Sequence, residues 1–214
     1  MERPEVKICG LTRRVDAEVS EASGASYVGA IFVPGTPREV LPETAASLAE
    51  SVRIPLIAVF ADLRATEIVR IARRAGAKGI QLHGSEPPHL IQALRGEGEW
   101  ELWKAIRVRS ERDIRDACHR FGELVDLLLL DGWQAGRLGG TGTPFPWDAL
   151  GSVREEIPSH VRVGVAGGLS PENVREAALR LDPDLVDVSS GVESAPGIKD
   201  PQRVKDFVEK ALDP

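Results

Sequence analysis

The chain is poor in the residues that build disulfide frameworks and cysteine-based metal sites. Its 214 residues include two cysteines, one methionine and one tyrosine, and aromatic side chains make up 5% of the sequence. Cys9 and Cys118 are too few for a disulfide scaffold, and their separation matches no metal-ligand spacing. We therefore expect both cysteines to remain reduced thiols.

Long apolar runs and clusters of basic residues are also missing. No stretch is apolar and long enough to span a bilayer, and the first residues lack the charged-then-apolar pattern of a secretory signal. We expect a cytoplasmic protein with no membrane partner. The net charge is -6 and no run of lysine and arginine occurs, so nucleic acid is not an expected partner.

What the sequence does contain is a regular alternation of short apolar runs and amphipathic segments. Hydrophobic residues make up 42% of the chain, enough for one domain over residues 1–214 with a sizeable core. Eight apolar runs in this length predict a single-domain α/β fold, a (β/α)8 TIM barrel, with a doubly wound open sheet as the alternative. The expected strands are residues 6–9, 27–33, 56–60, 79–83, 102–108, 125–130, 161–166 and 185–188.

Five segments between these runs carry apolar residues at helical spacing. They lie within residues 45–52, 68–75, 114–121, 174–181 and 204–211. Ser170-Pro171 and Asp200-Pro201 each place a capping side chain before a proline, which predicts a helix start at both positions. The longest loop is expected over residues 131–146.

Unusual residues gather where the expected strands end. Because a TIM barrel places its active site at the carboxyl ends of its strands, we expect these residues to surround one site. Strand alternation puts Lys7 on the same face as Cys9, and Asp187 on the same face as Ser189. The candidate residues are Cys9, Arg38, His83, Asp131, Gly167, Gly168, Asp187, Ser189, Ser190 and Gly191.

Cys9 and Asp131 are the candidates for proton transfer. A thiol acts as a base only when it is ionised, and a nearby cation such as Lys7 favours that form. An aspartate across the same site could supply the matching acid. The alternatives are that Cys9 is a small packing residue, that Asp131 is a turn residue, and that His83 is hydrogen-bonded scaffold.

Two glycine-containing turns follow the seventh and eighth expected strands, where barrels often hold phosphate. They are Gly167-Gly168 and Ser189-Ser190-Gly191. Glycine lets the backbone approach an anion closely, and amides at the start of a short helix can donate hydrogen bonds to it. Arg38 could grip a carboxylate at the other end of the same ligand. The loop Gly139-Gly140-Thr141-Gly142 lacks the lysine and the spacing of a nucleotide-binding loop.

The motifs, taken in order, closely resemble those of the phosphoribosylanthranilate isomerase family. The resemblance covers essentially the whole chain, and its most specific parts are the cysteine motif and the serine-serine-glycine motif. It rests on Lys7-Ile8-Cys9-Gly10-Leu11-Thr12, Thr36-Pro37-Arg38, Gln81-Leu82-His83-Gly84, Leu130-Asp131, Gly139-Gly140-Thr141-Gly142, Ala166-Gly167-Gly168-Leu169-Ser170-Pro171-Glu172-Asn173-Val174 and Asp187-Val188-Ser189-Ser190-Gly191-Val192-Glu193.

The resemblance implies an Amadori rearrangement of N-(5-phosphoribosyl)anthranilate, a step of tryptophan biosynthesis that needs no cofactor and no metal. By position, Asp131 matches the general acid that opens the sugar ring, and Cys9 matches the general base that removes a proton from C2. Arg38, His83 and Asp187 are then expected to contact the phosphorylated small-molecule substrate, and the two glycine turns to bind its phosphate.

The resemblance has one clear departure, in the loop after Gly142. The family commonly has a lysine and an aspartate before the tryptophan, whereas this chain has Thr143-Pro144-Phe145-Pro146-Trp147. Two alternatives therefore remain open, namely another phosphosugar isomerase or epimerase barrel, and a barrel that binds a phosphorylated metabolite without catalysis. The sequence also leaves the assembly open between a monomer and a homodimer.

Overall fold

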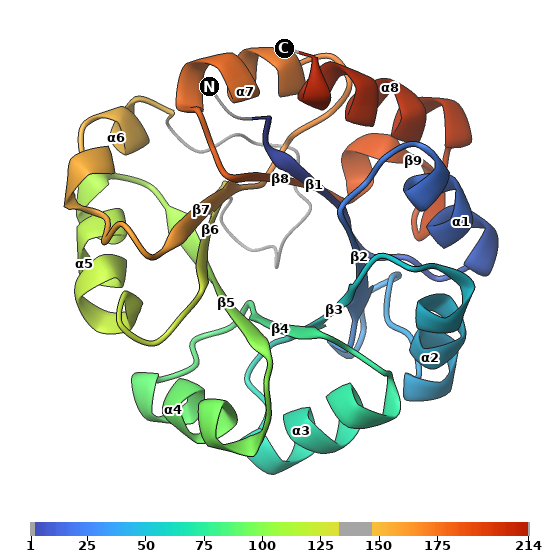
Figure 1. Cartoon of the computed structure of the whole chain (residues 1–214), viewed down its shortest axis with the longest axis horizontal. Helices are drawn as coiled ribbons and strands as arrows, with labels where there is room; N and C mark the ends of the chain where they lie inside the picture. Colours follow the sequence, from blue (N-terminus) through green and yellow to red (C-terminus); the bar gives the residue numbers. More distant parts are fainter. Residues whose placement is uncertain (1–2, 133–146, 214) are drawn as a thin grey trace.

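A closed barrel of eight parallel strands forms the centre of the computed structural model, which describes residues 3–132 and 147–213 (Figure 1). Each strand pairs with the next along the chain, and β1 pairs with β8 so that Lys7 lies opposite Asp187. The predicted TIM barrel is confirmed, and the open sheet is excluded. The strands are β1 (Glu5–Ile8), β2 (Tyr27–Ile31), β3 (Leu56–Phe60), β4 (Gly79–Leu82), β5 (Glu101–Val108), β6 (Leu127–Gly132), β7 (Arg162–Val165) and β8 (Leu185–Val188).

Helices surround the barrel and cover the outer faces of the strands (Figure 1). A short 3-10 helix and a two-stranded antiparallel hairpin lie between β8 and the last helix. The α-helices are α1 (Arg14–Ala22), α2 (Pro42–Ser51), α3 (Ala65–Arg74), α4 (Pro88–Glu97), α5 (Glu111–Phe121), α6 (Asp148–Gly151), α7 (Val174–Leu181) and α8 (Pro201–Leu212). The remaining elements are η1 (Arg154–Glu156), η2 (Ser190–Val192), β9 (Glu193–Ala195) and β10 (Ile198–Lys199).

The four leucines of β6 show how strand alternation sets the direction in which the side chain of Asp131 points. Leu128 and Leu130 belong to the core between strands and helices, whereas Leu127 and Leu129 belong to the core inside the barrel. Because side chains alternate along a strand, Asp131 follows Leu129 on the inward side. This alternation gives Asp131 the inward direction that the sequence predicts for it.

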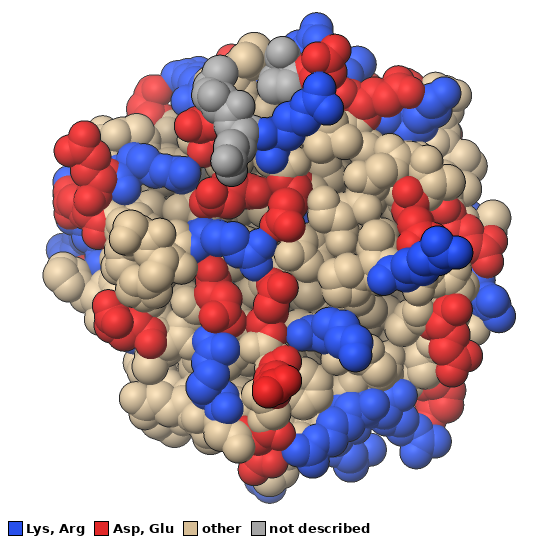
Figure 2. All heavy atoms as spheres, viewed as in Figure 1, with Lys and Arg blue, Asp and Glu red and all other residues tan. Residues whose placement is uncertain are grey.

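The other end of the barrel is filled by large side chains and closed by ion pairs. Trp103 is fully buried inside the barrel, with its ring edge-on to Tyr27 at a centroid distance of 5.1 Å. Arg162 on β7 pairs with Glu5 on β1 and with Glu101 on β5, each two strands away around the barrel. Figure 2 shows acidic and basic side chains interspersed across the face seen along the barrel. A packed interior at this end leaves the opposite end for a ligand.

One of the two predicted helix starts is correct and the other is wrong. Asp200 caps α8 because its Oδ1 accepts hydrogen bonds from the backbone nitrogens of Gln202 and Arg203, at 2.9 and 3.0 Å. After Ser170-Pro171, however, α7 begins only at Val174. The Asn173 side chain bonds back to the backbone nitrogen of Ser170 and to the Gly168 carbonyl, which makes a turn before the helix.

Several short or weakly patterned elements were not predicted from the sequence. They are α1, α4, α6 and the β9–β10 hairpin. None of the helices within residues 3–132 and 147–213 combines the length and the apolarity that a bilayer crossing needs. The predicted loop over residues 131–146 lies largely outside the described residues, since Asp131 and Gly132 belong to β6.

Candidate active site

A cavity of about 640 Å³ lies at the carboxyl ends of the strands, and all ten predicted site residues line it. Cys9 and His83 directly follow β1 and β4, Asp131 lies near the end of β6, and Asp187 lies in β8. The glycine turns follow β7 and β8, and Arg38 comes from the segment after β2. The structure therefore brings the ten candidates together, as the strand-end positions indicated.

Cys9 lies beside a buried ion pair that joins the first and last strands. Its side chain is 5% exposed, while Lys7, two residues earlier, is fully buried and bonds Asp187 through Nζ and Oδ1 at 3.0 Å. Gly29 on β2 makes room for this arrangement, because a Cβ there would lie 2.9 Å from Cys9 Sγ and 3.0 Å from Lys7 Cε. The thiol therefore lies next to the Lys7 cation and faces the cavity.

Burial and charge act in opposite directions on the thiol. Burial raises the pKa of Cys9, and the neighbouring Lys7 lowers it, with a net shift above the ordinary value. Burial also lowers the pKa of Lys7, but Asp187 and Cys9 outweigh it, so the pKa of Lys7 is raised. Lys7 is therefore a persistent cation that limits the cost of forming a thiolate in the interior.

Asp131 is held by His83, which is held in turn by Gln81. His83 Nε2 lies 3.0 Å from Asp131 Oδ2, and His83 Nδ1 lies 3.0 Å from the Gln81 amide nitrogen. With that amide as the donor, His83 Nδ1 accepts, and its Nε2 carries the hydrogen that points to Asp131. Asp131 is 4% exposed, so this contact fixes its carboxyl in the cavity wall.

The two glycine turns pack directly against each other. Gly191 has no room for a side chain, since a Cβ there would overlap the carbonyl oxygen of Leu169 in the turn after β7. Close backbone packing therefore places the segments that follow β7 and β8 side by side at one edge of the cavity. Backbone amides of this kind can donate hydrogen bonds to an anion.

Three buried polar atoms on residues that line the cavity have no hydrogen-bond partner among the described residues. They are Thr36 Oγ1, Gln81 Oε1 and Ser189 Oγ. A buried polar atom without a partner costs about 1–3 kcal/mol. A polar ligand that bonds these atoms would recover that free energy, so the cavity favours a ligand with several hydrogen-bonding groups.

Arg38 lines the cavity, and part of its guanidinium is already hydrogen-bonded to another residue of the protein. Its Nε and Nη2 donate to the two carboxylate oxygens of Glu193, both at 2.7 Å. Lys199 donates to the same carboxylate at 2.9 Å. Glu193 lies within a motif of the sequence, but nothing in a single chain indicates that it pairs with Arg38. Lys199 carries no sequence signal, and reasoning from sequence missed both.

The arrangement suits proton transfer on an anionic ligand. A thiol beside a cation and a carboxyl held by histidine face the same cavity, and the last two turns offer amides at its edge. Within the two described ranges, no group of three or more His, Cys, Asp and Glu residues is placed to hold a metal ion. The Gly139-Gly142 loop and the departure at Thr143-Pro146 lie outside the described residues.

Comparison with known proteins gives one consistent family. Residues 6–210 match the family model of N-(5'-phosphoribosyl)anthranilate (PRA) isomerase. The N-(5'-phosphoribosyl)anthranilate isomerase of Rubrobacter xylanophilus is 40% identical over 209 residues, which cover 97% of this chain and 98% of that protein. More than one solved structure of phosphoribosylanthranilate isomerases also superposes over nearly the whole chain.

Two of these structures are informative about ligand and assembly. One, from Thermotoga maritima, consists of monomers generated from a dimeric enzyme, with a TM-score of 0.86, 35% identity and coverage of 97% of this chain and 98% of the other. A second holds reduced 1-(o-carboxyphenylamino)-1-deoxyribulose 5-phosphate, with a TM-score of 0.85, 33% identity and the same coverage of 97% and 98%.

Proposed function

The chain belongs to the N-(5'-phosphoribosyl)anthranilate isomerase family, and on that premise we propose how its own residues carry out the reaction. The enzyme converts N-(5-phosphoribosyl)anthranilate into 1-(2-carboxyphenylamino)-1-deoxyribulose 5-phosphate, an intramolecular redox isomerisation in tryptophan biosynthesis. The observation that carries the residue assignment is that the Cys9 thiol and the Asp131 carboxyl line one cavity from different strands.

The first step is opening of the furanose ring, with Asp131 as the general acid. Its carboxyl gives a proton to the ring oxygen, the bond between that oxygen and C1 breaks, and the anthranilate nitrogen lone pair forms the C1–N double bond of a Schiff base. His83 holds one carboxyl oxygen at 3.0 Å, which leaves the other free to face the sugar. Because the carboxyl is already held in position, less conformational entropy is lost in reaching the reactive geometry.

The second step is removal of the C2 proton, with Cys9 as the general base. The thiolate takes the proton, the C–H electrons form a C1–C2 double bond, and the imine nitrogen is neutralised to give an enolamine. Tautomerisation then places a proton on C1 and leaves a ketone at C2, so no external oxidant or reductant is needed. Lys7 stabilises the thiolate by its positive charge.

Substrate orientation follows from where the cavity holds positive and donating groups. We assign the phosphate to the amides of Gly167, Gly168 and the segment 189–191, where the buried Ser189 hydroxyl also lacks a protein partner among the described residues. Arg38 binds the anthranilate carboxylate, and Asp187 lines the wall near the sugar. The reacting carbons then lie between Cys9 and Asp131.

An assay of the purified protein tests this function directly. Phosphoribosylanthranilate generated in the cuvette should lose its fluorescence when the protein is added, at a rate proportional to protein concentration. Turnover of a different phosphosugar with no effect on phosphoribosylanthranilate would favour another barrel isomerase or epimerase. Binding of the reduced product analogue without turnover would instead favour a non-catalytic barrel.

Alkylation of Cys9 by iodoacetamide is expected to have a midpoint pH above that of a free cysteine, about 8.5. The thiolate is the reactive form, and burial raises the pKa of Cys9, so a higher pH is needed to reach half of the maximal rate. The measurement follows the Cys9 adduct by mass spectrometry in the Cys118→Ala background, which leaves one thiol. A midpoint at or below 8.5 would contradict the proposed effect of burial.

Location, domain and assembly complete the proposal. We place the enzyme in the cytoplasm, where biosynthetic enzymes act and where both thiols stay reduced. Residues 1–214 are taken as one domain, because β1 and β8 pair with each other and close the barrel. A homodimer is the proposed assembly, supported by the dimeric Thermotoga maritima relative, and light scattering of the purified protein tests it.

A further inference from the structure

Arg38 is oriented by a carboxylate before any ligand binds. Glu193 accepts from Nε and Nη2, which is the side edge of the guanidinium. A planar guanidinium gripped along this edge can no longer rotate freely, and its outer edge, Nη1 with the second hydrogen of Nη2, keeps one direction. Arg38 lines the cavity while Glu193 lies behind it, with side-chain exposures of 16% and 6%.

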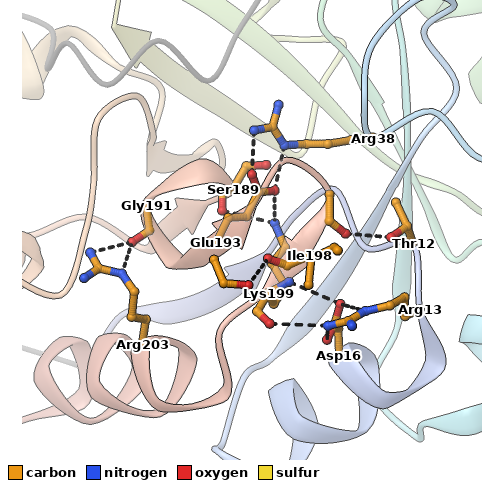
Figure 3. Close-up of polar contacts among 12 residues, drawn as sticks. Thr12, Arg13, Asp16, Arg38, Ser189, Gly191, Glu193, Ile198, Lys199 and Arg203 are labelled. Carbon is orange, nitrogen blue, oxygen red and sulfur yellow. Dashed lines mark hydrogen bonds and ion pairs between the residues drawn. The ribbon is translucent and has the colours of Figure 1, made fainter.

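Glu193 is itself held from behind by Lys199. The Lys199 ammonium donates to Glu193 Oε1 at 2.9 Å and to the Ser189 carbonyl at 3.0 Å, and its side chain is 1% exposed. Figure 3 shows Arg38 and Lys199 reaching the same carboxylate from two sides. We call these three residues the Arg38–Glu193–Lys199 chain. It ties the arginine to the turn that begins at Ser189.

The pKa directions are those of a carboxylate held between two basic side chains in a largely buried position. Burial raises the pKa of Glu193, but the hydrogen bonds and charges of Arg38 and Lys199 outweigh it and lower the pKa overall. Burial lowers the pKa of Lys199 and outweighs the opposing effect of Glu193, so the pKa of Lys199 is lowered overall. With two cations and one anion, the chain carries a net charge of one positive unit at a nearly buried position. A carboxylate on the ligand would complete the charge balance.

The hairpin that carries Glu193 and Lys199 is anchored to other parts of the barrel mouth. The Thr12 hydroxyl donates to the Gly197 carbonyl at 2.6 Å, and Arg13 donates to the Lys199 carbonyl at 3.4 Å (Figure 3). Gly197 also packs against the segment that bears Arg38, since a Cβ there would lie 2.9 Å from the Pro37 carbonyl oxygen. The hairpin is thus a fixed support for Glu193.

We infer that Glu193 is a positioning residue that aims the outer edge of Arg38 at the anthranilate carboxylate and links that contact to the phosphate turn. Glu193 touches no reacting atom, and its effect passes through Arg38. The inference rests on the proposed function and deepens it, because it states how one subsite of the same cavity is built. Glu193 should therefore matter for ligands that carry the carboxylate and not for ligands that lack it.

Two ligands that differ only in the carboxylate test this inference. One is the reduced 1-(o-carboxyphenylamino)-1-deoxyribulose 5-phosphate, and the other is its counterpart made from aniline. Calorimetry should show that Glu193→Gln weakens binding of the first by about 10-fold or more, as expected when a charged hydrogen-bond partner is lost. Binding of the aniline counterpart should change less than about 2-fold, because it makes no contact with the outer edge of Arg38.

Kinetics give a second readout for the same variant. Glu193→Gln should raise KM for phosphoribosylanthranilate more than it lowers kcat, since Cys9 and Asp131 stay in place. The matched control is Glu101→Gln, which removes a carboxylate partner of Arg162 at the opposite end of the barrel. This control should leave the affinity for both ligands unchanged, and it should leave KM and kcat unchanged.

The outcomes separate the inference from the function on which it rests. If the wild-type protein binds neither ligand, the proposed function and the inference fall together. If it binds both and Glu193→Gln weakens both equally or neither, the positioning role alone is refuted. If Glu193→Gln does not fold, Glu193→Asp repeats the comparison, because it keeps the negative charge beside Lys199 but shortens the reach to Arg38, and it should show the same selective loss.

Discussion

Replacing Cys9 with alanine is expected to lower kcat by about 10²- to 10⁴-fold, the range for loss of a general base or acid. Asp131→Asn should have an effect in the same range, because the amide keeps the shape of the carboxyl and cannot give up its proton in the same way. Both variants should keep KM within a few-fold, since neither residue is assigned to the phosphate or to the anthranilate carboxylate.

The measurement is single-turnover and steady-state loss of substrate fluorescence, with the reduced product analogue as a check on binding. Cys118→Ala is the matched control for Cys9, because Cys118 lies in α5 and does not line the cavity. It should retain full turnover. Turnover at the wild-type rate by either Cys9→Ala or Asp131→Asn would refute the assigned role of that residue.

Lys7→Met is expected to cost about 3–5 kcal/mol of unfolding free energy, because it leaves Asp187 as a buried charge without its partner. The same change should raise the pKa of Cys9 further, since Lys7 is the main group that lowers it. Urea unfolding measures the first effect, and the pH dependence of Cys9 alkylation measures the second. Both effects arise from one ammonium group.

A double variant separates the structural part of that result from the electrostatic part. Lys7→Met with Asp187→Asn removes both charges, so it should recover much of the lost stability while the pKa of Cys9 stays raised. If the single variant were as stable as the wild type, the buried pair would not be the tie between β1 and β8 that the geometry indicates. If alkylation of Cys9 kept its wild-type midpoint, Lys7 would have no electrostatic role.

The barrel was predictable because buried parallel strands appear in a sequence as short apolar runs. The expected strands over residues 56–60 and 185–188 match β3 and β8, and the remaining expected strands differ from the observed ones by one or two residues at most of their ends. Helix α1 was missed because its N-cap residue, Arg13, makes no side-chain cap and because the helix buries polar residues such as Asp16 and Ser20. The Ser170-Pro171 start was wrong because Asn173 folds back onto that turn.

The sequence indicated which residues line the site, but it did not indicate which residues pair with one another there. Strand-end positions, and for Arg38 the loop after the second strand, pointed to ten of the residues that line the cavity. The contacts that tune them join residues far apart in the sequence, such as Lys7 with Asp187 at a separation of 180 residues and Arg38 with Glu193 at 155. Such pairs depend on how the strands are arranged around the barrel, which a single sequence does not state.

The pairing of β1 with β8 also has a consequence for how this chain matures on the ribosome. Lys7 is synthesised before its only carboxylate partner among the described residues, Asp187, which is made 180 residues later. Until β8 has left the exit tunnel, the nascent chain must keep β1 unpaired along one edge, with a cation in the position that later becomes interior. Non-local pairing of this kind delays folding, so the barrel can close and the thiol acquire its neighbours only after β8 has been translated.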